Sequence, residues 1–398
     1  MDISAHVAHL ARHKKIPSEK WVPGPFLDTL FDYEGFLNKG PIATAPQDGG
    51  GKEIAIIGAG ISGLIAGYEL LRAGFNPVIY EASDRIGGRL YTVDMGDGAL
   101  AEMGAMRVPT SHRTVWHYAE HFGVPHAKFP DPGQVFTQLY YKGQTLDWHP
   151  TDEGPPAPFA EISEDFKAMM GPFAKAIYPA WQAGDFDTVR DMWQLMISRH
   201  PIDSFYEAVH RGTVWTAEQM EDFGALGLGS GGFGPMFQID FISALRYVLE
   251  KHNIGLQLFT DGLANFVDRI VDEPHGKRTL RDCIKTNTPV TGLDWNGGCT
   301  EVQTKDAATQ YDAVIVAMSS RAADMLGLTL PTRSGKRLIP QPAAQTLREL
   351  HMTAASKLFI RTKTKFWKDK PGLPEMILTD EIPRSLYCLD YPLSLIHI

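Results

Sequence analysis

The chain has 398 residues, of which 43% are hydrophobic and 21% are charged, and its formal net charge is −9. This length allows two or three domains with sizeable cores, and the composition is that of an ordinary globular protein. The negative balance and the lack of a long basic stretch disfavour nucleic acid or an anionic membrane as a partner.

The cysteines and the N-terminal sequence indicate the compartment. Cys283, Cys299 and Cys388 lack C-x-x-C spacing, which argues against a disulfide framework and against a structural zinc site. The first residues, MDISAHVAHLARHKK, contain no apolar core of a secretory signal, and no run of about 18 apolar residues follows anywhere. We therefore expect a cytoplasmic protein without a membrane-spanning helix.

Residues 1–52 are expected to form an N-terminal arm. A helix is predicted over 6–15, the proline-interrupted stretch 21–26 is predicted to pack through its aromatic side chains, and 45–51 (APQDGGG) is predicted to be a flexible lead-in. No chemistry is assigned to this arm, although it could contribute to a contact in a homo-oligomer.

A glycine-rich turn follows the first apolar run. The run 54–57 (IAII) predicts a buried parallel strand because it lacks polar alternation. Gly58, Gly60 and Gly63 then have G-x-G-x-x-G spacing, which allows a sharp turn, the close approach of a pyrophosphate and tight packing of a helix on the strand. The predicted helix, 62–73, directs its first N–H groups at the phosphates.

A second strand and an acidic residue complete the fingerprint. Gly74 ends the helix, residues 76–80 (NPVIY) predict a strand, and Glu81 follows it. Glu81 comes about 20 residues after the second glycine, where an acid accepts hydrogen bonds from ribose hydroxyls. Because strand, turn, helix, strand and acid occur in the required order, we predict a dinucleotide site rather than a structural glycine-rich turn.

The next residues indicate which dinucleotide is bound. Arg85 and Arg89 flank Gly87 and Gly88 in the sequence RIGGR. This segment resembles the R-x-G-G-R signature of the flavin amine oxidases, and the resemblance implies FAD. A nicotinamide dehydrogenase, the competing interpretation, has no general need for this second loop.

A substrate-binding element follows. Residues 102–107 (EMGAMR) resemble the G-A-M-R element of flavin-dependent L-amino acid oxidases and tryptophan 2-monooxygenases, in which the arginine binds the substrate carboxylate. Arg107 suits this role because a guanidinium is always charged and binds a carboxylate through two parallel bonds. A monoamine or polyamine oxidase has no carboxylate to bind, so Arg107 argues against that alternative.

Between residues 111 and 250 the patterns are mixed. A helix is predicted over 111–122 with Ser111 as its N-cap, and its histidines His112, His117 and His121 are expected to lie on a half-exposed face rather than to bind a metal.

A hairpin is predicted over 135–148 with its turn at 142–143, followed by a helical insertion over 159–224 whose Met and aromatic residues mainly form core. The glycine-rich residues 227–235 predict a tight loop bordering the active site. The helix predicted after them, over 236–250, carries Asp240, which either neutralises a cationic substrate side chain or lies on a solvated face.

The sequence then returns to the nucleotide-binding fold. A helix is predicted after Gly262, ending near Val271, and strands are predicted over 284–293, 299–303 and 311–317. The resemblance implies that the backbone of Val290 meets the adenine and that the apolar run 312–317 is a buried strand beneath the flavin.

Two further site residues follow from the resemblance. Residues 354–360 (AASKLFI), followed by Phe366 and Trp367, look like the family's lysine element, in which a strand lysine holds water near flavin N5; Lys357 is the matching residue. A strand-edge lysine that prevents aggregation is the alternative interpretation. Tyr387 is predicted as a second carboxylate partner, although Tyr391 fits nearly as well.

Taken together, the sequence predicts an α/β protein with a Rossmann-like FAD-binding domain of the amine oxidase and glutathione reductase type, an inserted mixed substrate domain and a helical subdomain. The predicted divisions are an arm at 1–52, FAD-binding parts at 53–134 and 255–330, a substrate-binding and helical insertion at 135–254, and a second substrate part at 331–398. The predicted catalytic residues are Arg107, Lys357 and Tyr387. The predicted FAD contacts are Gly58, Gly60, Ile61, Ser62, Gly63, Glu81, Ala82, Arg85, Gly87, Gly88, Arg89, Gly104, Ala105, Met106, Arg107 and Val290.

The resemblance implies oxidation of an L-amino acid at the Cα–N bond, with O2 as acceptor. The product is either a 2-oxo acid with ammonia and peroxide or, by oxidative decarboxylation, an amide. Family members extend past residue 398, so the sequence is expected to be truncated at its C-terminus, and a non-catalytic flavin-binding remnant stays as a third alternative.

Overall fold

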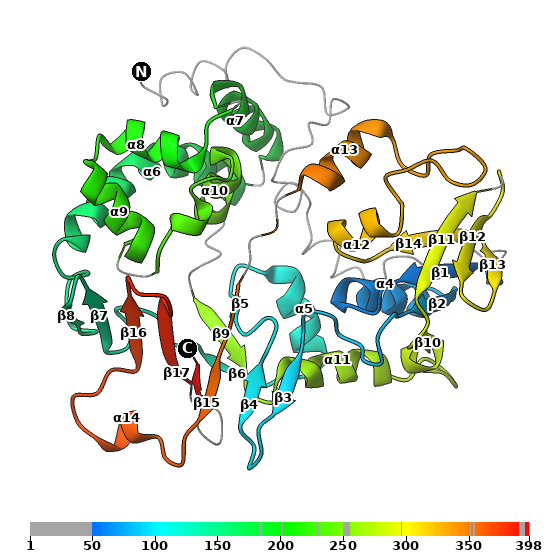
Figure 1. Cartoon of the computed structure of the whole chain (residues 1–398), viewed down its shortest axis with the longest axis horizontal. Coiled ribbons are helices and arrows are strands. Elements are labelled where there is room, and N and C mark those ends of the chain that lie inside the picture. Colours follow the sequence, from blue (N-terminus) through cyan, green and yellow to red (C-terminus); the bar gives the residue numbers. More distant parts are fainter. Residues whose placement is uncertain are drawn as a thin grey trace.

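A computed structural model describes most of the chain from residue 50 onwards (Figure 1). The described residues are 50–183, 185–200, 202–228, 231–249, 255–295, 297–350, 352, 355–389 and 395–397. The helix predicted over 6–15, the arm at 21–26, most of the lead-in 45–51 and Tyr391 lie outside these residues.

A four-stranded parallel sheet forms the centre of the predicted nucleotide fold. Its order is β10-β2-β1-β14. Its parts are β1 (Glu53–Ile57), α4 (Ile61–Arg72), β2 (Asn76–Tyr80), β10 (Ile284–Lys285) and β14 (Ala313–Val316). The predicted order of strand, helix and strand is therefore confirmed, and the parallel pairing of β1 with β14 joins segments far apart in the sequence.

One prediction for this sheet was wrong. The run 312–317 was expected to be a buried strand, but Ala313 is exposed and the other residues of β14 are only partly buried. The burial of β14 is incomplete because it is the edge strand of the sheet as described and pairs there with β1 alone. A three-stranded antiparallel meander lies beside it, made of β11 (Val290–Trp295), β12 (Thr300–Thr304) and β13 (Ala308–Tyr311), and the helices α12 (Ser320–Met325) and α13 (Gln341–Glu349) follow.

Short strands and two helices connect this sheet to the rest of the molecule. These elements are β3 (Thr92–Asp94), β4 (Leu100–Glu102), β5 (Val108–Pro109), α5 (Arg113–His121), β6 (His126–Lys128), β9 (Leu256–Phe259), α11 (Leu263–Asp272) and η2 (Leu280–Cys283). The helix predicted to end near Val271 is confirmed. The predicted N-cap Ser111 was wrong: α5 begins after His112, without a side-chain cap, because a turn precedes it in which the Arg113 N–H donates to the Ser111 carbonyl.

The second lobe contains a six-stranded mixed sheet of order β15-β18-β17-β16-β7-β8. Its elements are β7 (Thr137–Tyr141), β8 (Gln144–Trp148), β15 (Phe359–Arg361), α14 (Phe366–Asp369), β16 (Met376–Thr379), β17 (Ser385–Leu389) and β18 (Leu395–His397). The predicted hairpin is confirmed, with its turn at Lys142 and Gly143, both at positive φ. Parallel pairing of β16 with β7 brings the two predicted substrate segments into one sheet.

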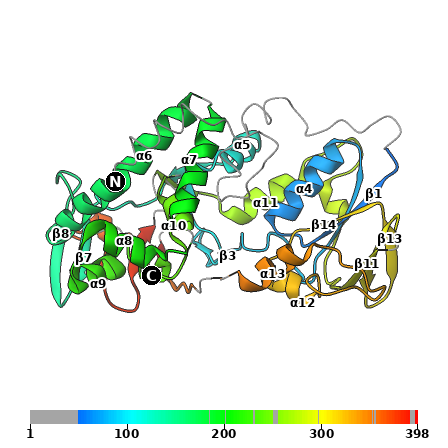
Figure 2. The same ribbon diagram turned by 90° about the horizontal axis from the view of Figure 1, so that it is seen from above.

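Helices cover one part of this lobe, on the opposite side of the molecule from α4 and β1 (Figures 1 and 2). They are α6 (Phe159–Gln182), α7 (Phe186–Arg199), α8 (Phe205–Thr213), α9 (Ala217–Leu226), η1 (Gly234–Met236) and α10 (Phe241–Leu249). Their buried Phe, Met and Trp side chains form one core with β7, β8, β16 and β17, so the predicted core role of these residues is confirmed.

The helix predicted over 236–250 begins later than expected. The short η1 occupies 234–236, and α10 starts at Phe241 because Asp240 accepts a hydrogen bond from the Ser243 N–H at 2.8 Å. This bond is that of a helix N-cap. Asp240 is exposed and caps α10, which favours the structural interpretation of this residue over a role in binding a cationic substrate.

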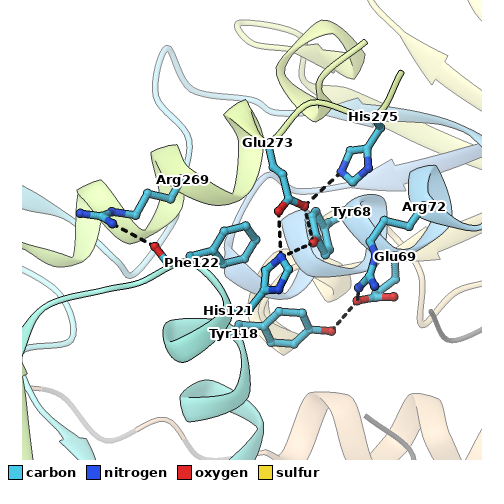
Figure 3. Close-up of polar contacts among 9 residues, drawn as sticks. All are labelled: Tyr68, Glu69, Arg72, Tyr118, His121, Phe122, Arg269, Glu273 and His275. Atoms are coloured by element: carbon cyan, nitrogen blue, oxygen red, sulfur yellow. Dashed lines mark hydrogen bonds and ion pairs between the residues drawn. The ribbon is translucent and has the colours of Figure 1, made fainter. Parts of the chain in front are cut away.

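A polar cluster joins α4, α5 and the segment after α11 (Figure 3). The Tyr68 hydroxyl donates to Glu273 Oε2 at 2.5 Å, and His121 Nε2 lies 2.8 Å from Glu273 Oε1. Arg72 and Tyr118 both donate to Glu69 Oε1 at 2.9 Å. These contacts bind the C-terminal half of α4 to its neighbours.

The cluster predicts a stability effect that depends on pH. Although burial raises it, hydrogen bonds from Tyr68 and His121 hold the pKa of Glu273 below its usual value. A carboxylate with a lowered pKa in the folded state stabilises the fold above its unfolded pKa, and this contribution is lost as the pH falls through the folded pKa. We expect Glu273→Gln to lower the Tm at pH 7 by a few degrees, corresponding to about 1–2 kcal/mol.

The measurement is thermal unfolding at pH 7 and near pH 4. The difference between Glu273→Gln and the unchanged protein should shrink at the lower pH, because the unfolded chain then takes up a proton at Glu273 and the stabilisation from the lowered folded pKa decreases. Glu120→Gln, a change at an exposed position on α5, is the matched control and should leave the Tm unchanged. A Tm difference that stays constant between the two pH values contradicts the role of the Glu273 charge.

Candidate active site

The turn between β1 and α4 forms a backbone cradle. Gly58 has φ +106°, and a Cβ added to it would lie 2.7 Å from the Ala317 carbonyl oxygen. A Cβ on Gly63 would lie 2.0 Å from the Gly58 oxygen, so the helix packs directly on the turn. Gly60 is the N-cap of α4 and provides no side-chain cap, and no acidic residue occupies the first turn. The helix N-terminus is therefore suited to an anion.

The second glycine loop packs on the first through its backbone. The Gly87 N–H donates to the Ala59 carbonyl at 2.8 Å, and a Cβ on Gly88 would lie 3.0 Å from Gly60 Cα. Arg85 stabilises this loop internally, because it donates to the Gly88 carbonyl at 2.9 Å and stacks over the Tyr91 ring. Because glycines form the contact between the two loops, no side chain separates them, and a phosphate can approach both backbones.

Glu81 lies at the end of β2 beside the same cradle. Its carboxylate accepts hydrogen bonds from the Ala59 N–H at 2.9 Å and from the N–H and hydroxyl of Ser83 at 2.9 and 2.8 Å. A carboxylate has about four acceptor sites, so capacity is left for a ribose hydroxyl. Ala82, the next residue, is exposed at this edge.

The segment before Val290 runs along the Glu81 loop. The N–H groups of Asn287 and Thr288 donate to the carbonyls of Ser83 and Glu81 at 2.8 and 2.9 Å. Val290 is partly buried and packs with the cluster that contains Tyr80. The structure therefore brings the predicted adenine contact to the predicted ribose contact, across about 200 residues of sequence.

The EMGAMR segment lies against the second glycine loop. The Ala105 N–H donates to the Arg89 carbonyl at 2.8 Å, and a Cβ on Gly104 would lie only 1.8 Å from the same oxygen. The Arg89 side chain is exposed and forms no ion pair with a carboxylate of the described residues. It is therefore able to neutralise a phosphate.

Aromatic groups surround the Arg107 guanidinium. Its carbon lies 5.3 Å from the Phe129 ring centre and 5.7 Å from that of Tyr387, and Nη1 lies 3.4 Å from the Tyr387 hydroxyl. Burial raises the pKa of Asp131 and that of Tyr247, and the positive charge of Arg107 opposes both shifts. No carboxylate within the described part of the chain forms an ion pair with Arg107, so its charge is available to a ligand.

Lys357 contacts the backbone of the EMGAMR segment. Its Nζ donates to the carbonyls of Glu102, at 3.2 Å, and Gly104. Lys357 precedes β15 instead of lying in it, which differs from the predicted strand position. Burial lowers the pKa of the Lys357 ammonium, while the charge of Glu102 opposes this shift.

A pocket of about 450 Å³ lies between α4, the EMGAMR segment, α5 and α11. Its walls include Ile61, Ser62, Ala105, Arg107, Leu263 and Phe266. It therefore extends from the first turn of α4 to the substrate-binding arginine predicted from the sequence. Met106 is partly buried and packs against the core of the other lobe.

Comparison with known proteins identifies the family. The sequence profile described as flavin containing amine oxidoreductase matches residues 61–394. The chain belongs to this family. Tryptophan 2-monooxygenase of Pseudomonas savastanoi is 35% identical over 397 residues, covering 92% of this chain and 70% of the relative.

Other relatives agree with this membership, and solved structures share the fold. Tryptophan 2-monooxygenase of Pantoea agglomerans pv. gypsophilae is 34% identical (92% and 70% of the two chains), and L-amino-acid oxidase of Sistrurus catenatus edwardsii is 26% identical (89% and 66%). The fold resembles putrescine oxidase bound to putrescine (TM-score 0.66, 18% identity, 87% and 75% coverage) and cyclohexylamine oxidase of Brevibacterium oxydans IH-35A (0.65, 19%, 87% and 74%).

The chain is therefore a flavin-dependent oxidoreductase with FAD as its cofactor. The residues present fit this group. The cradle of glycines without Cβ atoms and the uncapped N-terminus of α4 suit the pyrophosphate, and Glu81 retains acceptor capacity for the ribose. The fold class predicted from the sequence is confirmed, whereas the roles of individual site residues stay predictions.

Sequence reasoning missed several neighbours of Arg107. Phe129, Asp131 and Tyr247 surround it, yet they lie at distant positions without a recognisable motif. Glu102 was noted only as part of the EMGAMR segment, although it is a buried carboxylate.

The predicted absence of a metal site concerned the histidines of α5. Within the described ranges, no three His, Cys, Asp or Glu side chains are grouped so as to hold a metal ion. His121 instead contacts Glu273 and Tyr68. Among the described residues, no helix combines the length and apolar character needed to cross a membrane.

Proposed function

We propose that this protein oxidises an L-amino acid at its Cα–N bond, with FAD as the immediate electron acceptor and O2 as the final one. The observation that carries the proposal is the environment of Arg107. This cation borders the pocket, forms no ion pair with a described carboxylate and lies 3.4 Å from the Tyr387 hydroxyl. The relatives named tryptophan 2-monooxygenase and L-amino-acid oxidase support the same substrate class.

Arg107 binds the substrate carboxylate through two parallel hydrogen bonds, and Tyr387 adds a third donor. This fixes the orientation of the substrate, which is a large part of the catalytic effect in such reactions. The bound FAD supplies the acceptor for the hydride that leaves Cα. The free-base amine provides the electron pair that forms the C=N bond of the imino acid.

The fate of the imino acid decides the product. If it leaves first, water hydrolyses it to a 2-oxo acid and ammonia, and O2 is reduced to H2O2. If it stays, oxidative decarboxylation gives an amide, CO2 and water. Lys357 contributes a positive charge near the reaction with oxygen, where negative charge develops on the reduced species.

We further propose an aromatic substrate side chain. Phe129, Tyr247 and Tyr387 gather around Arg107, and aromatic rings pack favourably on one another. A lysine substrate is less well supported, because Asp240, the carboxylate predicted for its amine, caps α10.

The test is an anaerobic titration of the purified protein with L-tryptophan, L-phenylalanine and L-lysine while the flavin absorbance is recorded. We expect bleaching by an aromatic amino acid and little bleaching by lysine. After O2 is admitted, analysis of the products distinguishes the amide from the 2-oxo acid. Bleaching by phenethylamine in preference to phenylalanine would favour an amine oxidase, and bound flavin that no amino acid bleaches would contradict the proposal.

A further inference from the structure

Glu102 is a buried carboxylate that no catalytic role explains. It is the last residue of β4 and only 1% exposed. Burying a charged carboxylate is unfavourable unless hydrogen bonds or an opposite charge compensate it. The contacts of Glu102 therefore indicate what its charge does in this protein.

The carboxylate caps α11 from a different element. The Leu263 N–H donates to Glu102 Oε1 at 2.8 Å, and the Ala264 N–H donates to Thr92 Oγ1 at 2.9 Å. Thr92 lies opposite Glu102 in the β3–β4 pair, and its hydroxyl donates to the carboxylate at 2.9 and 3.0 Å. The helix's own N-cap, Gly262, has no side chain to do this. An acid at a helix N-terminus is favoured by the helix dipole.

The backbone of Glu102 also contacts Lys357, the lysine that we propose acts in the reaction with oxygen. Lys357 Nζ donates to the main-chain carbonyls of Glu102 and Gly104. These bonds hold the ammonium close enough for the negative charge of Glu102 to raise its pKa. Burial lowers the pKa of Lys357, the negative charge of Glu102 raises it and the nearby Arg107 lowers it. In Glu102→Gln the two backbone carbonyls would still accept hydrogen bonds from Lys357, but the negative charge that raises its pKa would be lost, while burial and Arg107 would still lower that pKa.

Two further charged groups, Arg107 and Asp261, act on Lys357 and Glu102 respectively. Arg107 comes from the same EMGAMR segment, and Asp261 comes from the turn before α11, where Arg269 binds it at 2.7 Å. Burial raises the pKa of Glu102 above its ordinary value, with a smaller contribution from Asp261, and the hydrogen bonds from Leu263 and Thr92 and the charge of Lys357 oppose this shift. The carboxylate and the ammonium thus stabilise each other's ionised forms.

We infer that Glu102 is a positioning residue: its carboxylate favours the protonated form of Lys357 and fastens the segment carrying Arg107 to the N-terminus of α11. The inference rests on the proposed function, because that function gives Lys357 and Arg107 their roles. Glu102 does not touch the substrate itself. It acts by setting the charge of one side chain and the place of another.

The first test measures the titration of Lys357 directly. The rate at which an amine-reactive acylating reagent labels Lys357 is followed against pH by peptide mass spectrometry, which needs neither substrate nor turnover. In Glu102→Gln, the apparent pKa of Lys357 should fall by about one unit, since a nearby opposite charge shifts a pKa by about 1–3 units. In Glu102→Asp, which keeps the charge, most of this shift should be rescued.

Glu69→Gln is the matched control. Glu69 is also a buried carboxylate, 5% exposed, but it lies on α4 and pairs with Arg72 and Tyr118. Its removal should leave the titration of Lys357 unchanged. A Glu102→Gln protein that keeps its fold and flavin but titrates at Lys357 as the unchanged protein does would overturn the inference.

A second variant keeps the inference testable if Glu102→Gln does not fold. Lys357→Met removes the cation and leaves the carboxylate buried without it, so the Tm should fall by about 3 °C or more at pH 8. Because Glu102 can then take up a proton, this loss should become smaller towards pH 5. A Tm equal to that of the unchanged protein at both pH values would overturn the inference, whereas failure of amino acid oxidation alone would overturn only the proposed function.

Discussion

Replacing Arg107 with alanine should raise the Kd for the amino acid substrate by about 100-fold or more, as expected from losing a charge-assisted, two-bond contact with a carboxylate. The guanidinium is oriented by Phe129 and Tyr387 and has no described carboxylate as an ion-pair partner. Arg107→Lys should keep the charge but lose the planar fork, and we expect an intermediate loss of about 10-fold. The Kd is read from the concentration dependence of anaerobic flavin bleaching.

Comparing an amino acid with its amine makes this test specific. Phenylalanine and phenethylamine differ by the carboxylate, so Arg107→Ala should largely abolish the preference for phenylalanine while bleaching by phenethylamine changes little. Arg321→Ala, a change at an exposed position on α12, is the control and should behave as the unchanged protein. Equal preference for phenylalanine before and after the Arg107 change would contradict carboxylate binding by this residue.

Replacing Gly63 with alanine should abolish flavin retention. The added Cβ would lie 2.0 Å from the Gly58 oxygen and 3.1 Å from the Ala317 Cβ, so α4 must move away from the turn that forms the cradle. Real Cβ contacts do not occur at the shorter distance, and both neighbours directly follow strands of the packed sheet, Gly58 after β1 and Ala317 after β14. We expect the flavin content to fall below about one tenth and the Tm to decrease by several degrees, as for an overpacked core site.

Gly171→Ala is the matched control for this change. Gly171 lies within α6, and a Cβ there would meet no atom within 4 Å. Because alanine favours a helix over glycine by about 0.5–1 kcal/mol, flavin content should be normal and the Tm equal or slightly higher. The ratio of absorbance at flavin and protein wavelengths measures the content. Full flavin occupancy in Gly63→Ala would show that the tight helix–turn packing is not needed.

These two predictions depend on different levels of the structure. The contacts of Gly63 lie within the β1–α4–β2 unit and with its neighbour β14, and the spacing of the glycines was sufficient to predict the unit from the sequence. The environment of Arg107 involves Phe129 and Tyr387, and Tyr387 comes from β17, 280 positions away. The sequence indicated Arg107 and, through the family resemblance, Tyr387, but it did not indicate Phe129.

The errors in the sequence predictions have a common physical cause. Ser111 was predicted as a cap, yet a turn precedes α5, and α10 begins at Phe241 because Asp240 caps it. The apolar run in β14 predicted full burial, but its position at the edge of the sheet leaves it partly exposed. In each case the decision depends on which group is available nearby, and periodicity does not contain that information.

The sequence by itself therefore determined the β1–α4–β2 unit, because its strands, glycine turn and helix are consecutive in the chain, and the family resemblance indicated the second glycine loop and Arg107 as parts of the site. Only the tertiary structure decided that Lys357 binds the carbonyls of Glu102 and Gly104, more than 250 positions away. It also decided that Glu102 caps α11 rather than facing solvent. Burial, hydrogen bonding and charge at such sites are properties of neighbours in space, and the folding of distant segments against each other selects those neighbours.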